Sequence, residues 1–485
     1  MSSTGRRSSN MQDSLDLMQF HDQYLYAGAA NLPLQHHLLH HHHQQGFVLA
    51  KDHAPEFADP AAEAPSEQDL AASGSEGGGD DSAEQRNDGA EATARGEEEE
   101  EEEARGVRMI ALLMECAVAV SVGNLSDANV ILLELSQAAS PYASSCGERL
   151  VAYFAKAMAA RLVTTCLGVV SIPPPCPPSW PSVHAAFRAF HNVAPLARLA
   201  HLACNQAVLD AVHGRRLVHV VDLDAVPGGA LQWLSLLPAL AARPGGPPAL
   251  LRLTGFGASA PALRDAGSQL AALARKLGLP FEFRAVTRRP GGDDHNGGAE
   301  QHVLMPRKRP GEAVAVHWTR HATYDDAAGD DDVLRLVRWM EPDVLTLVEP
   351  ERSSGGHFLD RFVSALHHYS ALFDAMGASR PARDDASRHL AEDGVLGREI
   401  SSVLGVGGRE RKVGCWKTEM LARHGFLRAG CGVGRAQMVA GACPAGLGYT
   451  VADDHHGTLR LGWKGTPLYA ISTWTWCPTA HHAQR

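Results

Sequence analysis

Hydrophobic positions recur at helical spacing from about residue 107, and the period of this pattern changes near residue 217. Leu112, Cys116 and Val120 lie on a single face one turn apart, as in an amphipathic helix. Similar patterns predict more helices, the second capped by Ser126, whereas the proline-rich stretch 171–181 predicts a loop. The predicted helices cover residues 107–120, 126–138, 148–162, 183–190 and 196–212. The first ordered part of the chain is therefore predicted to be all-helical.

From residue 217 onward, short runs rich in β-branched residues alternate with helical patterns. The first run, LVHVVDL at 217–223, has apolar residues on both faces, which is typical of a buried strand in a parallel sheet. The predicted strands cover 217–223, 250–254, 281–286, 314–318 and 344–348, and the predicted helices cover 231–241, 262–277, 332–340 and 358–376. This alternation predicts an α/β fold with a doubly wound, mostly parallel sheet. Strand-like pieces at 449–451, 459–463 and 468–473 predict antiparallel additions at one sheet edge.

The first 103 residues differ from the rest in charge and complexity. They carry 5 basic and 22 acidic residues, while the remainder carries 39 and 33. They include a histidine-rich tract at 36–43 and seven consecutive glutamates at 97–103. Such a segment buries too little apolar surface to offset chain entropy. We therefore predict a disordered tail over 1–103, acting as a solvated spacer or as an interaction segment.

Composition narrows the class of protein. The 9 cysteines form no CxxC pair, which favours a reduced compartment over a disulfide scaffold or a structural zinc site. No run of about 18 uncharged apolar residues occurs, so no membrane span is expected. The N-terminus also lacks the apolar stretch of a secretory signal. The mildly basic body permits contact with nucleic acid without arguing for it.

Asp222 and Asp224 follow the first predicted strand, at the position where doubly wound sheets bind ligands. A nucleotide or adenosyl cofactor needs a tight glycine turn there. The sequence DLDAVPGGALQW has a glycine pair but no GxGxxG. Asp222 could recognise a ribose or cap backbone N–H groups of the following loop, and the missing glycine signature favours capping. We therefore predict no cofactor, no metal and no catalytic residue.

Other polar residues at strand ends allow two interpretations each. His317 and His321 have the spacing of a metal-binding pair, although a hydrogen-bonded histidine is more common. Glu349 and Glu351 could act in acid–base chemistry, but loop capping is the default.

The C-terminal tryptophans and two short basic clusters are equally ambiguous. Trp463, Trp474 and Trp476 suit a partner interface, yet strand tryptophans more often pack in a core. The clusters at 307–309 and 409–412 could contact phosphate, or they could be ordinary solvated loops.

Several segments resemble, in order, the motifs of the plant GRAS family. Val218, His219, Val220, Val221 and Asp222 resemble its VHIID motif, and Leu231, Gln232 and Trp233 resemble the segment that follows this motif. Segment 107–162 is similar to the first leucine-rich region, and 250–286 to the second. Arg361 and Phe362 lie in a segment similar to the PFYRE block, and Trp463 and Trp474 in one similar to the SAW motif. Phrases such as LRLTGFG and HYSALFDAM look most like the scarecrow-like branch.

The resemblance implies a GRAS domain over residues 104–477. Its regions would be 107–162, 183–241, 250–286, 312–405 and 406–477. It further implies a Rossmann-like sheet, similar to that of methyltransferases, with an N-terminal helical cap. The implied function is regulation of transcription in the nucleus, without enzyme activity and with DNA reached mainly through partners. Short-root-like GRAS proteins and indeterminate-domain zinc-finger factors are the implied partners. A methyltransferase-like enzyme or a small-molecule-gated regulator is the alternative.

Overall fold

The computed structural model describes residues 84–168, 180–223, 230–257, 259–287, 308–320, 330–352, 356–379, 385–406, 425–430, 433–454 and 457–477. The histidine-rich tract 36–43, Asp224, His321, Arg307 and the basic cluster 409–412 lie outside these residues. The chain divides into two compact units, one of which includes Met109–Arg485 and the other of which is Ala29–Arg108. The second unit is described only from residue 84, as the first part of helix α3 (Glu84–Ser121).

Helix α3 begins within the segment that was predicted to be disordered. Residues 84–103 are helical, and this differs from the prediction. Nine of these 20 residues are glutamate and three are alanine, and both residue types have high intrinsic helix propensity. A helix satisfies its own backbone hydrogen bonds, so it can form without the apolar burial on which the prediction of disorder depended.

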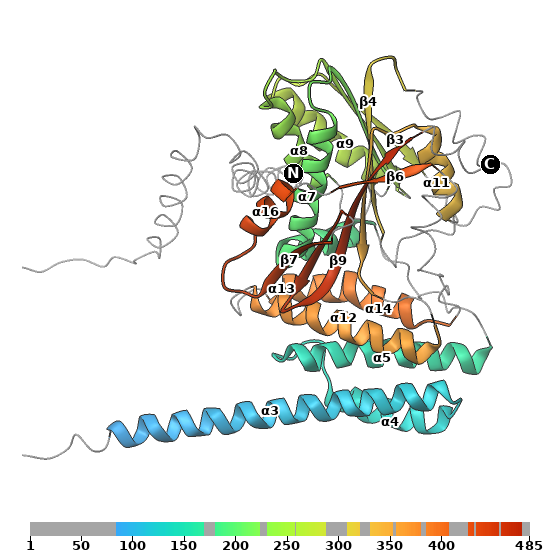
Figure 1. Ribbon diagram of the computed structural model, residues 1–485. Coiled ribbons are helices and arrows are strands. Elements are labelled where there is room, and N and C mark those ends of the chain that lie inside the picture. The colour runs from blue at the N-terminus through green and yellow to red at the C-terminus, as the bar shows by residue number, and fades with distance from the viewer. Residues whose placement is uncertain are drawn as a thin grey trace, which may run out of the picture. The chain divides into compact units, whose positions relative to one another are not determined.

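An all-helical cap precedes the sheet and is completed by helices from later in the chain. Its early members are α3 from Met109 on, α4 (Leu125–Ala138) and α5 (Cys146–Leu167). Asn124, and not the predicted Ser126, is the N-cap of α4, because its side chain accepts from the Asp127 N–H. The later members are α12 (Phe358–Ala378), α13 (Asp385–Ala391), the π-helix η1 (Glu392–Leu396) and α14 (Gly397–Leu404). Figure 1 shows α12 and α14 between α5 and the sheet.

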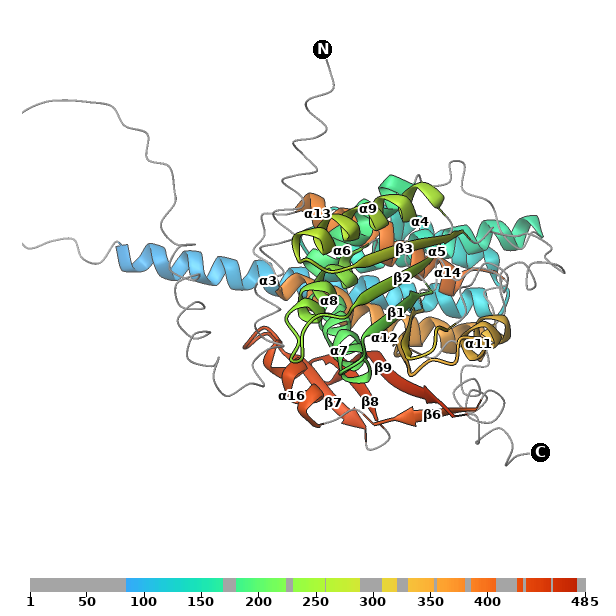
Figure 2. The ribbon, with the colours of Figure 1, turned by 90° about the horizontal axis from the view of Figure 1, so that it is seen from above.

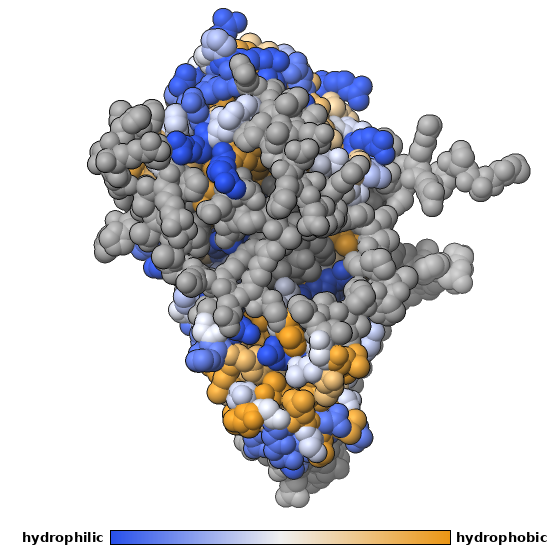
Figure 3. Space-filling view, turned by 90° about the vertical axis from the view of Figure 1, so that its right-hand side faces the viewer, coloured by the Kyte–Doolittle hydropathy of each residue, from blue (hydrophilic) through white to orange (hydrophobic). Residues whose placement is uncertain are grey.

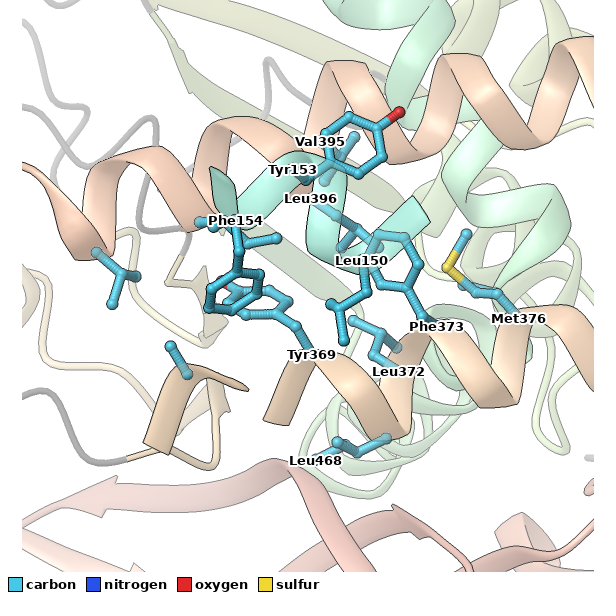
Figure 4. Close-up of a cluster of buried hydrophobic side chains, with 14 of the residues drawn as sticks. Leu150, Tyr153, Phe154, Tyr369, Leu372, Phe373, Met376, Val395, Leu396 and Leu468 are labelled. Carbon is cyan, nitrogen blue, oxygen red and sulfur yellow. The ribbon is translucent and has the colours of Figure 1, made fainter. Parts of the chain in front are cut away.

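The cap is held by one apolar core. Figure 4 shows Tyr153 and Phe154 of α5 facing Tyr369 and Phe373 of α12, with Val395 and Leu396 of η1 beside them. A buried ion pair lies at the margin of this core. The Arg149 Nε of α5 donates to both carboxylate oxygens of Glu392, each at 3.1 Å. The π-helix is thus fixed to the first helical region by both packing and charge.

The sheet has the strand order β3-β2-β1-β4-β5-β9-β8-β7, and β6 also pairs with β9. The strands are β1 (Leu217–Asp222), β2 (Leu250–Gly257), β3 (Phe281–Thr287), β4 (Glu312–Thr319), β5 (Val344–Pro350), β6 (Phe426–Ala429), β7 (Tyr449–Asp454), β8 (Thr458–Trp463) and β9 (Thr466–Trp476). The first five pair in parallel, and β9, β8, β7 and β6 pair antiparallel. The order β3-β2-β1-β4-β5 is that of the Rossmann fold. Both the mostly parallel sheet and the antiparallel additions are confirmed.

Helices cover both faces of the parallel strands, as Figures 1 and 2 show. One face packs on α7 (Pro195–Ala211), α8 (Leu231–Ala241) and α9 (Ala260–Lys276), with Val218, Val220 and Trp233 in its core. The other packs on α11 (Asp330–Trp339), with Val221, Val316 and Trp474 in its core. Helix α6 (Trp180–Val193) lies next to α7, and α16 (Val433–Gly441) contacts α7 and β7.

Among the described helices, α5 alone has the length and apolar composition to cross a membrane. Half of its most apolar window is buried inside the protein, and it carries the buried Arg149. These features are typical of a core helix.

Candidate functional site

Strands β1 and β4 are adjacent although β2 and β3 come between them in sequence. In a doubly wound sheet this reversal of strand order marks the crevice where ligands bind, at the carboxyl ends of the strands. A cavity of about 80 Å³ lies there, lined by Phe187, Phe190, His191, Ala197, Ala200, His201, Asp222, Leu231, Gln232, His317, Thr319, Val348 and Tyr469. We call it the switch-point cavity.

Asp222 ends β1 at this cavity and is bound to the helix that follows. The Trp233 indole N–H donates to Asp222 Oδ2 at 2.7 Å. Both side chains are buried, Asp222 being 5% and Trp233 1% exposed. A buried carboxylate needs such a donor, since burial without one is costly. The described residues thus give Asp222 a structural role with an indole of α8, and the predicted capping of the loop after β1 lies outside them.

His317 of β4 stands opposite Asp222 in the register of the sheet. Its Nδ1 lies 2.8 Å from Thr346 Oγ1 and its Nε2 lies 2.9 Å from Thr319 Oγ1. The Trp233 ring meets the His317 ring edge-on, with centroids 5.5 Å apart. Both ring nitrogens thus have hydroxyl partners, which is the common alternative to metal ligation.

Gln232 joins α8 to α7 at the floor of the same region. Its Nε2 donates to Asn205 Oδ1 at 3.3 Å, and Asn205 Nδ2 donates to the Gln232 carbonyl at 3.1 Å. Leu231, one residue earlier, lines the cavity. The Leu-Gln-Trp segment thus contributes three side chains to packing around the switch point.

His191 and His201 were not singled out from the sequence. They come from α6 and α7, and His191 Nε2 lies 3.1 Å from His201 Nδ1. Tyr469 of β9 reaches the same cavity. No sequence signal marks these residues, because only the packing of α6 on α7 and of β9 on β5 brings them together.

The switch-point cavity is small for a cofactor. Ligand sites usually enclose about 300–1,000 Å³, whereas this cavity encloses about 80 Å³. That volume accommodates a few water molecules. Among the described residues no group of three or more His, Cys, Asp or Glu side chains is arranged to hold a metal ion.

His219, at the centre of the VHIID-like segment, faces the opposite side of the sheet from Asp222. Arg252 Nη2 donates to His219 Nδ1 at 3.1 Å, so His219 Nε2 carries the proton and lies 2.9 Å from Thr254 Oγ1. Arg252 also pairs with Glu312 at 3.3 Å. Burial, together with the Arg252 charge, lowers the pKa of His219 to about 3. This buried network links β1, β2 and β4 and keeps His219 neutral.

Four other candidate residues lie away from the switch point. Arg361 and Phe362 are buried on α12, where Phe362 packs edge-on against Phe154 at 5.6 Å. Trp463 is buried and donates to Asp374 Oδ2 of α12 at 2.7 Å. Trp474 is buried on the other face of the sheet and donates to Ser472 Oγ at 3.0 Å. The structure therefore gathers Asp222, Leu231, Gln232 and Trp233 and leaves these four in packing roles.

The two strand-end glutamates of β5 take part in ion pairs. Glu349 pairs with Arg320 at 3.5 Å, and Glu351 pairs with Arg460 at 2.9 Å. The end of β4 and strand β8 bring these arginines beside the end of β5, and the predicted loop capping stays a prediction because residues 353–355 lie outside the described residues.

The sequence profile of the GRAS domain family matches residues 109–475. The chain belongs to the GRAS domain family. The match begins at the residue where the larger compact unit resumes and ends within β9. It spans the helical cap, the switch point and the antiparallel strands.

Named relatives place this GRAS chain near the scarecrow-like branch, as the motifs predicted. Protein SCARECROW of Arabidopsis thaliana is 42% identical over 382 residues, covering 76% of this chain and 56% of the relative. Scarecrow-like protein 23 of Arabidopsis thaliana is 38% identical over 384 residues, covering 76% of this chain and 90% of the relative. The chain thus spans little more than half of SCARECROW but most of the shorter relative.

A solved structure agrees with the fold. The crystal structure of SCL7 in Oryza sativa matches with a TM-score of 0.62 and 26% sequence identity, covering 76% of this chain and 99% of that chain. The GRAS fold class inferred from the sequence is confirmed.

Proposed function

We propose that this GRAS chain regulates transcription in plant development as a nuclear protein–protein scaffold and not as an enzyme. Similarity to SCARECROW and to Scarecrow-like protein 23 supports a regulator of this kind. One observation carries the scaffold interpretation. At the switch point, where a Rossmann enzyme binds its ligand, Asp222 accepts from the buried Trp233 at 2.7 Å. The strand-end acid is engaged in packing at the place where a cofactor would need it.

The helical cap offers a surface for a partner. Figure 3 shows hydrophobic side chains gathered over the lower part of one face, where α3, α4 and α5 end in Figure 1. Val118, Val163 and Leu167 on these helices and Val122 in the turn after α3 are exposed large hydrophobic residues. Contiguous exposed apolar side chains favour a protein interface. We assign this surface to another GRAS protein, of the short-root-like type or a second copy of this chain.

DNA is reached mainly through partners in this proposal. The sheet domain would contact an indeterminate-domain zinc-finger factor, which reads the bases, as the family resemblance implies. The proposal predicts weak, salt-sensitive binding of DNA by the purified chain alone and tight binding when the zinc-finger partner is present. Salt-titrated fluorescence anisotropy with a labelled duplex measures both.

A variant of the helical cap and a matched control test whether the cap binds the GRAS partner. Val122→Asp places a charge on the exposed apolar surface and is expected to abolish association with the GRAS partner in a co-purification experiment. Leu427→Asp makes the same kind of change at an exposed residue of β6 and is expected to leave association intact. Strong site-specific DNA binding by the lone chain would contradict the scaffold proposal.

The second candidate is a small-molecule-gated regulator or a methyltransferase-like enzyme, and the position of the switch-point cavity favours it, because Rossmann enzymes bind ligands there. The small volume of the cavity and the hydrogen bonds among its side chains favour the scaffold instead.

A further inference from the structure

Strand β3 ends the row of parallel strands, as Figure 2 shows. The Leu251 N–H donates to the Pro280 carbonyl at 2.9 Å, and Leu251 stands opposite Phe281 in the register. In a parallel ladder the residues next to a paired position form the bonds. Phe281, Phe283 and Ala285 therefore direct their N–H and C=O groups away from β2. Within the described residues, no strand pairs with β3 on that side.

A groove runs beside this edge. It encloses about 470 Å³ and is lined by Ser268, Ala271, Ala274, Arg275, Leu279 and Phe281, with no residue of β2. Gly267 lets α9 approach β3 closely, since a Cβ there would clash with the Phe283 ring. Ala271, Ala274, Leu279 and Phe281 give the groove its apolar part, and Ser268 and Arg275 contribute polar groups.

Basic residues lie on both faces beside this edge. Arg275 and Lys276 are exposed at the end of α9, on the side of the groove, and Arg284 is exposed on the opposite face of β3. Basic residues at a helix end also offset the helix dipole, but Arg284 lies in a strand, where that explanation does not apply. Glu282 is the acidic residue of β3, and Arg309 lies 3.8 Å from it.

We propose that the open edge of β3 and this groove bind an acidic, extended peptide, which adds to the sheet as a further strand. Backbone hydrogen bonds would pair the peptide with Phe283 and Ala285, as in other cases of strand addition. Every second side chain of an extended peptide points to the same face, so apolar residues would enter the groove. Carboxylates at the intervening positions would face the opposite side and meet Arg284. The role of this contact rests on the proposed scaffold function, whereas binding itself can be measured without it.

The first test removes the backbone donor. The probe is a fluorescein-labelled short peptide in which valine and glutamate alternate, titrated with the purified full chain. Ala285→Pro deletes an N–H that faces away from β2 and should weaken binding about tenfold, through the lost hydrogen bond and the altered edge. Ala285→Val keeps the N–H and is the matched control, expected to bind like the unmodified chain. Circular dichroism confirms that both variants are folded.

The second test separates strand addition from charge attraction. Arg284→Glu should reduce peptide binding about tenfold, because an attraction for the peptide carboxylates becomes a repulsion. Arg188→Glu reverses an exposed charge on α6 and should leave binding unchanged. A peptide methylated on alternate backbone nitrogens keeps its charges and should bind about tenfold more weakly.

Three outcomes would overturn the proposal: equal binding of the methylated peptide, no effect of Ala285→Pro, or displacement of the peptide by a DNA duplex of equal charge. Displacement by DNA would show that the surface binds polyanions in general. These experiments use only the purified chain and a peptide. The peptide-binding proposal can therefore be overturned while the partner-dependent DNA assay still supports the proposed function.

Discussion

Two margins of the same sheet have opposite properties. At the carboxyl ends of β1 and β4, Asp222 and His317 are buried and bonded to neighbouring side chains. At the outer edge of β3, Glu282, Arg284 and Ala285 are exposed, and no described strand pairs there. The Rossmann topology predicts the first place as the binding site. In this protein side chains occupy the carboxyl ends of β1 and β4, and the outer edge of β3 is left open.

The difference teaches that topology fixes where a site could be, while side chains decide whether it is used. Trp233 lies at the start of α8 and donates to Asp222, which lines the switch-point cavity. A glycine-rich turn at that place would leave the crevice open for a phosphate. An aromatic residue closes the same space by donating to the strand-end acid.

The sharpest contrast is expected from aromatic truncation at the two margins. Trp233→Ala should lower the free energy of unfolding by about 3–5 kcal/mol, because a buried ring is lost and Asp222 loses its donor. Phe281→Ala, at the partly exposed edge, should cost roughly 1–2 kcal/mol, since less apolar area leaves water on folding. Urea denaturation of both variants measures the difference. Equal costs would show that the switch point is no better packed than the edge.

Acidification should distinguish the interior of the sheet from its edge. His219 has a folded pKa of about 3, against about 6.5 when unfolded. Between these values the unfolded chain binds more protons, so the stability from a neutral His219 is present above pH 6.5 and is lost as the pH falls. The loss should reach about 2 kcal/mol between pH 6.5 and 5. His368, whose pKa is lowered to about 4 by burial, adds a loss of the same sign.

His219→Gln isolates the contribution of His219 to the pH dependence of stability. Urea denaturation at several pH values should show a weaker pH dependence for this variant than for the unmodified chain. His213→Gln, at an exposed position, is the matched control and should follow the unmodified chain. An unchanged pH dependence in His219→Gln would mean that its network with Arg252 is open to water.

The smallest effect on stability is expected at the edge itself. Ala285→Pro should change the free energy of unfolding by about 1 kcal/mol or less, because its N–H is not part of the β2 ladder. Thermal denaturation checks this value. A much larger loss would indicate that β3 is paired on both sides and that its edge is not open.

The sequence predicted much of the fold because its apolar pattern is local. The pattern over 231–241 predicted α8 with the bounds that the structure has, and the antiparallel strands were anticipated. Strand β6 and the helices α13, α14 and α16 were not anticipated, because short elements without periodic apolar residues leave little signal. The N-cap of α4 fell two residues earlier than expected, since Asn and Ser are both good caps.

The candidate site was less predictable. The resemblance named Asp222 and Trp233 together, but the hydrogen bond between them depends on how α8 returns to β1. The link from His219 to Arg252 and Glu312 depends on the register of three strands, which no local pattern contains. The β3 edge was visible only once the strand order was known.

Titration calorimetry of the purified full chain with S-adenosylmethionine tests the central claim most directly. A switch point filled by its own side chains predicts no saturable heat at millimolar ligand, for the unmodified chain and for Asp222→Asn alike. Saturable one-to-one binding that is lost in Asp222→Asn would show that a cofactor occupies the crevice, and it would contradict the account.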